Sequence, residues 1–247
     1  MAEQERPAFY ALRPGGWRDF VTILHPPYTL WHLSYVAIGA AAAPQVHADR
    51  LFATLAAFFL AVGIGAHSLD ELHGRPLGTR LSRRTLIALA ATGLGGALAI
   101  GVAGVFVVSA TLAPLVLAGG FLVLAYNLEW FGGRFHTDFW FAAAWGAFPA
   151  LTGWWSNALG LHAVDQAIAA AAAVLGCFWL SVAQRRLSTP VRELRRRTEA
   201  VSGEQRLADG TIRQLDRASL TAPLDGSLRA LSVGVPLLAI AAVALRL

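Results

Sequence analysis

The chain has 247 residues, of which 56% are hydrophobic and only 14% are charged. Soluble domains carry about 25% charged residues, so the composition excludes an ordinary soluble protein and favours a membrane protein. The formal net charge of +5 would suggest nucleic-acid binding in a soluble protein. The distribution of the arginines explains this charge better, and we expect no nucleic-acid partner.

Apolar segments long enough to cross a membrane recur along almost the whole chain, without the period-two alternation of membrane β-barrels. We predict an all-α integral membrane protein, with residues 1–247 forming a single polytopic domain of about seven transmembrane helices. A polar segment at 185–227 separates the last two spans, and Thr189–Pro190 is predicted to begin a short amphipathic helix within it. The predicted spans are 28–46, 51–73, 85–107, 109–129, 138–158, 162–184 and 228–246.

The arginines predict the orientation in the membrane. If the chain alternates sides from its N-terminus, one side receives eighteen of the twenty arginines, and the other receives only Arg50 and Arg246. Under the positive-inside rule, the N-terminus and the arginine-rich loops are cytoplasmic. We therefore expect a protein of the cell (inner) membrane whose polar chemistry is confined to the cytoplasmic face.

The first twenty residues lack the charged, apolar and cleavage regions of a signal peptide, so we expect cytosolic polypeptide there. The next stretch, LHPPYTLWHLSY, places His25 just before the first predicted span and His32 two turns inside it. A lone histidine on an apolar helix is more often an interface residue than a ligand. We interpret His32 as an interface residue, with a ligand role as the alternative.

The end of the second predicted span carries a polar cluster. His67, Asp70, Glu71 and His73 fall within about 160° of helical arc. A carboxylate near the end of a span is costly unless it pairs or binds a cation. We predict that Asp70, Glu71 and His67 are catalytic and that all four side chains are candidate ligands of a divalent cation, Mg²⁺ or a histidine-compatible metal. In the alternative interpretation Glu71 pairs with Arg75 one turn later, and the histidines are interface residues.

Two further segments on the same predicted side carry polar side chains. They are AYNLEWFGGRFHTDFW at 125–140 and SVAQRRLSTPVRELRRR at 181–197. Arginine forks suit phosphate and anionic lipid head groups. For Arg192 and Arg195–Arg197, non-specific contact with anionic lipid is an equally good interpretation. The predicted substrate-binding residues are Arg75, Asn127, Arg134, Arg185 and Arg186.

Four stretches together resemble a known family: HPPYTLWHLSYVAIGAAAAP, GRPLGTRLSRRT, AYNLEW and GAFPALTG. They are similar to parts of the UbiA superfamily of intramembrane prenyltransferases, and the resemblance covers residues 20–190. His25–Pro26 stands where the family has Arg-Pro, and His67 and Asp70 fall on the first two aspartates of its Asn-Asp-x-x-Asp-x-x-x-Asp motif. The resemblance implies a UbiA-like bundle that transfers prenyl or related lipid groups with the help of Mg²⁺.

The sequence also departs from that family. The family has nine spans rather than the seven predicted here, and its second aspartate-rich motif is replaced by AQRRLSTPVRELRRR, which contains no aspartate. Arginines can partly replace a metal in stabilising diphosphate charge. We therefore expect a divergent enzyme with prenyl-transfer-like chemistry on an isoprenoid or other lipid substrate, surrounded by anionic lipid head groups. The alternative is a non-catalytic lipid-binding or assembly protein within a membrane complex.

Overall fold

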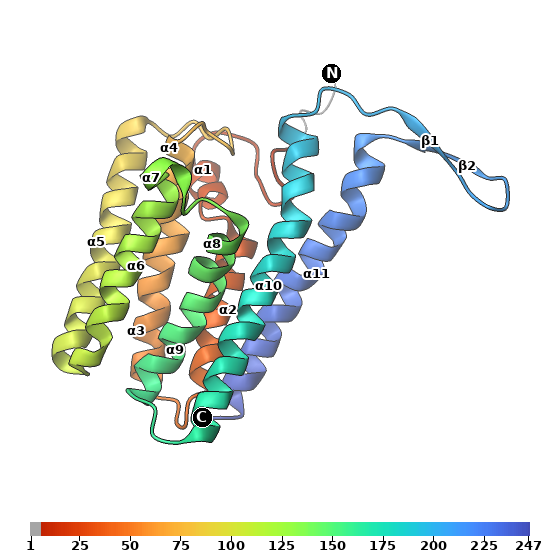
Figure 1. Ribbon diagram of the computed structural model, residues 1–247. Helices are drawn as coiled ribbons and strands as arrows, with labels where there is room; N and C mark the ends of the chain where they lie inside the picture. The colour runs from red at the N-terminus through yellow and green to blue at the C-terminus, as the bar shows by residue number, and fades with distance from the viewer. Residues whose placement is uncertain (1–5) are drawn as a thin grey trace.

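The structure is a computed structural model that describes residues 6–247. Within this range the chain forms a bundle of helices with one projecting arm (Figure 1). The helices of the first half are α1 (Trp17–Ile23), α2 (Pro26–Ala41), α3 (Ala48–Phe58), the π-helix η1 (Phe59–Ala66), α4 (His67–Leu72), α5 (Arg83–Val107), the 3₁₀ turn η2 (Ala110–Leu112) and α6 (Ala113–Asn127).

The second half begins with short helical pieces and ends with two long helices joined by a β-hairpin. Strands β1 and β2 of the hairpin pair antiparallel, with Gly203 opposite Leu215, and extend away from the bundle (Figure 1). The elements are α7 (Trp130–Gly133), α8 (Asp138–Ala142), the π-helix η3 (Ala143–Ala147), α9 (Phe148–Ala158), α10 (Val164–Arg196), β1 (Gly203–Arg206), β2 (Ile212–Leu215) and α11 (Arg217–Ala244).

Five helical segments among the described residues are long and apolar enough to cross a membrane. Their length and composition agree with the predicted all-α membrane protein. They are Ala48–Leu72, Arg83–Val107, Ala110–Asn127, Val164–Arg196 and Arg217–Ala244.

The other two predicted spans, 28–46 and 138–158, correspond to helices that are not among these five. Helix α2 has 16 residues, which gives about 24 Å at 1.5 Å per residue, against a hydrocarbon core of about 30 Å. The second predicted span is divided into α8, η3 and α9. Both nevertheless lie inside the bundle, beside the longer helices (Figure 1).

The polar segment predicted at 185–227 is mostly helical rather than a separate loop. Helix α10 continues without interruption through Pro190 to Arg196, so the short helix predicted to begin at Thr189–Pro190 is wrong. Asp216 caps α11, since its side chain accepts a hydrogen bond from the Ser219 amide. The helix-to-helix linker therefore shrinks to the hairpin and its flanks, residues 197–216.

Helix α2 occupies the centre of the bundle, where Trp31 and Tyr35 are fully buried. It crosses α9 at glycines: a Cβ on Gly39 would lie 1.9 Å from the Ala150 carbonyl oxygen, and one on Gly153 would lie 2.1 Å from that of Val36. Neither position has room for a methyl group. Small residues allow helix backbones to approach this closely, which strengthens dispersion contacts in a lipid environment.

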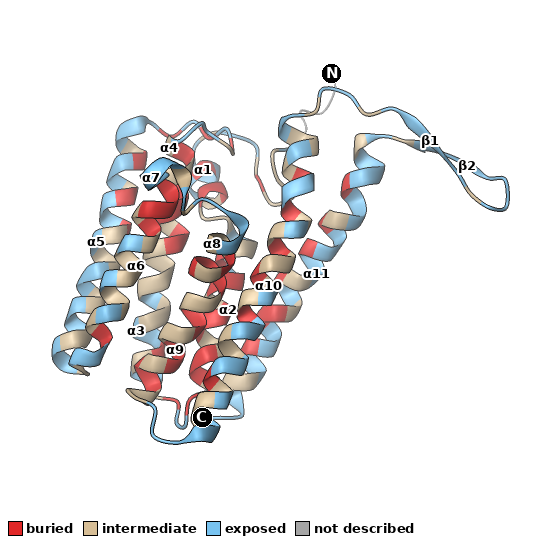
Figure 2. Cartoon of the chain, in the orientation of Figure 1, coloured by how far each residue is buried: buried red, intermediate tan, exposed pale blue. Residues whose placement is uncertain are grey.

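The outer surface of the bundle is apolar. Large side chains such as Phe106, Leu117 and Leu238 are more than two-thirds exposed, and the outward faces of α5, α6, α10 and α11 contain many exposed positions (Figure 2). A monomeric soluble protein rarely exposes so large an apolar surface, whereas a lipid-facing helix requires one.

The two ends of the bundle differ strongly in charge. The N-terminal segment, α4, α7 and the hairpin lie at one end, and the C-terminus lies at the other (Figure 1). The first end carries the arginine-rich segments. At the opposite end, Arg246 donates hydrogen bonds to the carbonyl oxygens of Ala43 and Pro44. The bundle therefore has one strongly basic end.

The glycine crossing gives a stability prediction. We expect Gly153→Ala to lower the free energy of unfolding by about 1–3 kcal/mol, because the added methyl group forces α2 and α9 apart. The measurement is thermal unfolding in detergent. Gly176→Ala on α10 is the matched control, since nothing lies within 4 Å of its Cβ position, and it should be neutral or slightly stabilising. Equal effects of the two changes would contradict the close crossing.

Candidate functional site

A polar cavity opens at the basic end of the bundle. Its volume is about 360 Å³, and it lies between α2, the η1–α4 segment, α6 and α10, with the N-terminal residues 7–10 forming part of the wall. Five arginines and three carboxylates line it, so its charge is positive. The charged residues are Arg185, Arg192, Arg195, Arg196, Arg197, Asp70, Glu129 and Asp225.

The π-helix η1 sets the rotation of the polar cluster that follows it. It packs backbone-to-backbone on α5, where a Cβ on Gly93 would lie 2.7 Å from the Leu60 carbonyl oxygen. A π-helical turn changes the rotation of the residues that follow it. His67, Asp70 and His73 line the cavity as a result, so these three predicted site residues are brought together.

Glu71 does not line the cavity. It is fully buried and accepts hydrogen bonds from the amides of Leu77 (3.0 Å) and Thr79 (2.8 Å) and from the Thr79 hydroxyl (2.8 Å). Both of its oxygens therefore hold the loop between α4 and α5. The alternative ion pair with Arg75 is not formed either, because Arg75 donates to the carbonyl oxygens of Thr79 and Leu81.

The predicted substrate-binding residues are divided by the fold. Asn127 and Arg185 line the cavity, whereas Arg75, Arg134 and Arg186 do not. Arg185 forms a 2.8 Å ion pair with Asp138 and lies over the Phe141 ring at 5.1 Å. Its guanidinium is thus held in place beside the cavity.

Arg192 and Arg196, for which a site role and non-specific lipid contact were equal interpretations, line the cavity. Because α10 remains helical past Pro190, Arg192 and Arg196 lie one turn apart on the face that begins with Arg185 and Ser188. The spacing 185, 188, 192, 196 is the signal that could have identified this face. It was missed because the helix was expected to end at 184.

The N-terminal segment contributes Tyr10, whose hydroxyl lies 2.8 Å from Nδ1 of His25. The His25 ring stacks on that of His67, with centroids 3.9 Å apart. Burial raises the pKa of Tyr10 well above its usual value. Burial, with smaller effects from His67 and two arginines, lowers the pKa of His25 well below its usual value. Both side chains are therefore neutral at pH 7 and form an uncharged wall of the cavity.

The side chains present do not fit a magnesium site of the kind that the family resemblance implies. Magnesium prefers several oxygen ligands, but Asp70 is the only carboxylate of the predicted cluster that lines the cavity. Among residues 6–247, no three His, Cys, Asp or Glu side chains are grouped so that they could hold a metal ion. The stacked rings of His25 and His67 also direct their nitrogen lone pairs in nearly parallel planes rather than toward one point.

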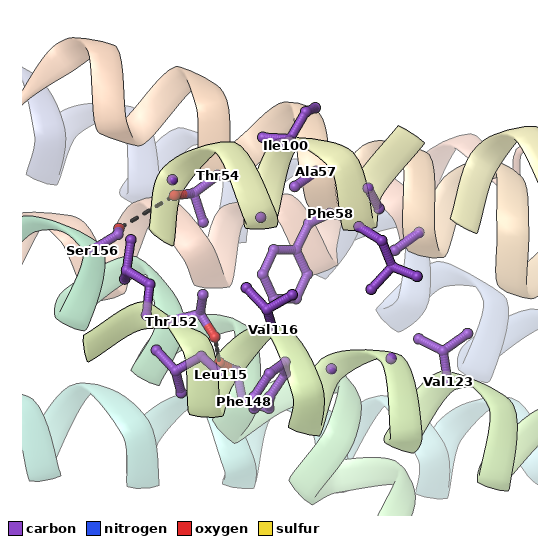
Figure 3. Close-up of a pocket in the computed structure, with 18 of the residues that line it drawn as sticks. Thr54, Ala57, Phe58, Ile100, Leu115, Val116, Val123, Phe148, Thr152 and Ser156 are labelled. Carbon is purple, nitrogen blue, oxygen red and sulfur yellow. Dashed lines mark hydrogen bonds between the residues drawn. The ribbon is translucent and has the colours of Figure 1, made fainter. Parts of the chain in front are cut away.

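An apolar groove lies beside the polar cavity. It is lined by α3, η1, α5, α6, η3 and α9, and its volume is about 180 Å³. Figure 3 shows Phe58, Val116 and Phe148 around it, with Thr54 hydrogen-bonded to Ser156 at one end. From Val62 to Arg50, which both line it, the groove extends about 18 Å at 1.5 Å per residue.

Cavity and groove meet at two side chains. Val62 and Trp145 line both spaces, so the polar cavity and the apolar groove share a wall. A ligand that reached from one into the other would need a polar end and an apolar chain.

Comparison with known proteins gives no match. No family model matches the sequence, and no curated protein or solved structure matches the chain.

The role of Glu71 gives a second prediction. We expect Glu71→Gln to lower the free energy of unfolding by about 1–3 kcal/mol. The substitution replaces one accepting oxygen of Glu71 with an NH₂ group, which cannot accept a hydrogen bond from the loop. Glu204→Gln on the exposed hairpin is the control. Thermal unfolding measures both. An unchanged midpoint for Glu71→Gln would contradict the role of Glu71 in holding the loop.

Proposed function

We propose that the protein binds an isoprenoid or related lipid, with its anionic head group in the polar cavity and its chain in the apolar groove. The observation that carries this proposal is that the polar cavity and the apolar groove share Val62 and Trp145 in their walls, so a basic space and an apolar one lie side by side. The groove length of about 18 Å slightly exceeds half the ~30 Å hydrocarbon core, which suits one lipid chain.

The charges of the cavity favour an anion. Arg195 is paired with Asp225 at 2.5 Å, and Arg185 is paired with Asp138. Among the described residues, neither Arg192 nor Arg196 forms an ion pair. Arg192 donates one hydrogen bond to the Thr189 hydroxyl oxygen. The remaining donors of the two guanidinium groups can bind phosphate oxygens bidentately.

We further propose that the protein is a divergent UbiA-like enzyme that carries out prenyl-transfer-like chemistry. Breaking the bond between an isoprenoid carbon and diphosphate develops negative charge on the leaving group and positive charge on the carbon. The arginines would stabilise the former. The rings of Tyr126 and Trp145, whose centroids are 5.5 Å apart at the junction, would stabilise the latter by cation–π interaction. Asp70 is the proposed acid or base.

The proposed location is the cell membrane, with seven crossings and a cytoplasmic N-terminus. The basic end of the bundle supports this orientation because positively charged loops are retained in the cytoplasm. The position of α2 and of the α8–α9 segment inside the bundle supports the two additional crossings. The polar cavity then faces the cytoplasm.

A non-catalytic lipid-binding or assembly protein is the second candidate. The observation that favours it is that Glu71 serves the loop between α4 and α5, so that Asp70 is left as the one carboxylate of its cluster in the cavity. Such a protein would bind the same lipid without turning it over.

A binding experiment tests the proposed ligand. We expect the double variant Arg192→Gln/Arg196→Gln to bind farnesyl diphosphate at least about tenfold more weakly, because each charge-assisted hydrogen bond is worth about 1.5–3 kcal/mol. The measurement is titration calorimetry on detergent-purified protein. The control, Arg206→Gln/Arg213→Gln, removes the same charge from the exposed hairpin. Equal loss in both variants would overturn the proposed head-group site.

A turnover experiment separates the two candidate functions. We expect purified protein to release inorganic pyrophosphate from farnesyl diphosphate when a membrane lipid extract supplies the acceptor. Asp70→Asn should slow this about a hundredfold, as expected for loss of an acid or base, while binding is retained. Binding without turnover in the unmodified protein would instead support the non-catalytic candidate.

A further inference from the structure

His32 lines the polar cavity, and its hydrogen bond shows which of its two ring nitrogens donates. His32 on α2 is 4% exposed and lines the polar cavity. Its Nδ1 lies 2.8 Å from the carbonyl oxygen of Trp145. A carbonyl oxygen can only accept, so Nδ1 donates, and in the neutral imidazole Nε2 then has a free lone pair.

The sequence explains why this carbonyl oxygen is available. In a continuous α-helix the Trp145 carbonyl would accept from the amide of residue 149, but that residue is Pro149, which has no N–H. The π-helix η3 (Ala143–Ala147) covers the same turn. The carbonyl therefore accepts from a side chain on the neighbouring helix.

The Nε2 atom has no hydrogen-bond partner among residues 6–247, since the one hydrogen bond of the His32 side chain is at Nδ1. Within residues 6–247, the buried imidazole nitrogens without partners are Nε2 of His25 and Nδ1 of His67. His32 Nε2 is not among these sealed nitrogens, and the His32 side chain lines the cavity. A lone pair in this position will accept a hydrogen bond from any donor that enters.

The surroundings restrict what that donor can be. The rings of Tyr35, Phe141 and Trp145 lie 6.0, 6.2 and 6.4 Å from that of His32, so aromatic rings surround this part of the cavity. The arginines that line the same cavity disfavour an ammonium group by charge repulsion. A neutral hydroxyl group on an apolar molecule satisfies both conditions.

We infer that His32 binds the hydroxyl group of a lipid alcohol, which is the acceptor substrate of this site, and receives its proton during transfer. This inference rests on the proposed function. In the step, the alcohol oxygen bonds to the first isoprenoid carbon, and that carbon's bond to diphosphate breaks with both electrons going to diphosphate. The hydroxyl proton passes to Nε2, and nothing is oxidised or reduced.

A matched pair of ligands tests the inference on the unmodified protein. Farnesol can donate a hydrogen bond, whereas farnesyl methyl ether has the same chain without a donor. We expect farnesol to bind about fivefold more tightly, as one neutral hydrogen bond is worth about 1 kcal/mol. In ¹⁵N spectra of labelled histidine, His32 should show the Nδ1–H form, and farnesol should shift its Nε2 signal. Equal affinities, or protonation at Nε2, would overturn the inference.

Substitution localises the effect. His32→Phe keeps an aromatic ring without the acceptor, and it should remove the preference for farnesol over the ether. His162→Phe, at an exposed histidine outside the cavity, should retain it. If His32→Phe keeps the preference, the inference fails. This outcome is distinct from failure of the proposed function, which would appear as unchanged farnesyl diphosphate binding in Arg192→Gln/Arg196→Gln.

Discussion

The close crossing of α2 and α9 fixes both the packing of the bundle and the position of His32. Gly39 and Gly153 leave no room for a methyl group between the two backbones, and the same approach brings His32 to the carbonyl oxygen of Trp145. In a lipid environment helices are held by dispersion and interhelical hydrogen bonds rather than by the hydrophobic effect. One contact region therefore supplies both bundle packing and the orientation of a polar side chain.

Irregular helix turns position the polar groups on both sides of the cavity. The π-helix η1 precedes His67 and Asp70, and the π-helix η3 contains Trp145. Such turns are frequent at functional sites because they redirect side chains and change which carbonyls are available. Here η1 precedes His67 and Asp70, which line the polar cavity, and η3 presents the Trp145 carbonyl oxygen to His32.

The arrangement of charge limits the free-energy cost of burying charged groups around the polar cavity. Buried carboxylates are paired or hydrogen-bonded, as Asp225 is with Arg195 and Glu71 is with the loop after α4. Arg192 and Arg196 form no ion pair with any of residues 6–247 and lie half-buried and exposed, respectively, at the basic end. The charge that lacks an internal partner is thus placed where an anionic ligand can approach it.

Hydropathy and charge are local properties of the chain, so the helical membrane class and the arginine-rich segments could be predicted from the sequence. It also located the polar cluster at His67 and Asp70. Only the tertiary structure separated Glu71 from Asp70 and added His32, Arg192 and Arg196 to the cavity. The physical reason is that helix rotation, π-helical turns and the continuation of α10 through Pro190 depend on packing against neighbouring helices, which no local pattern records.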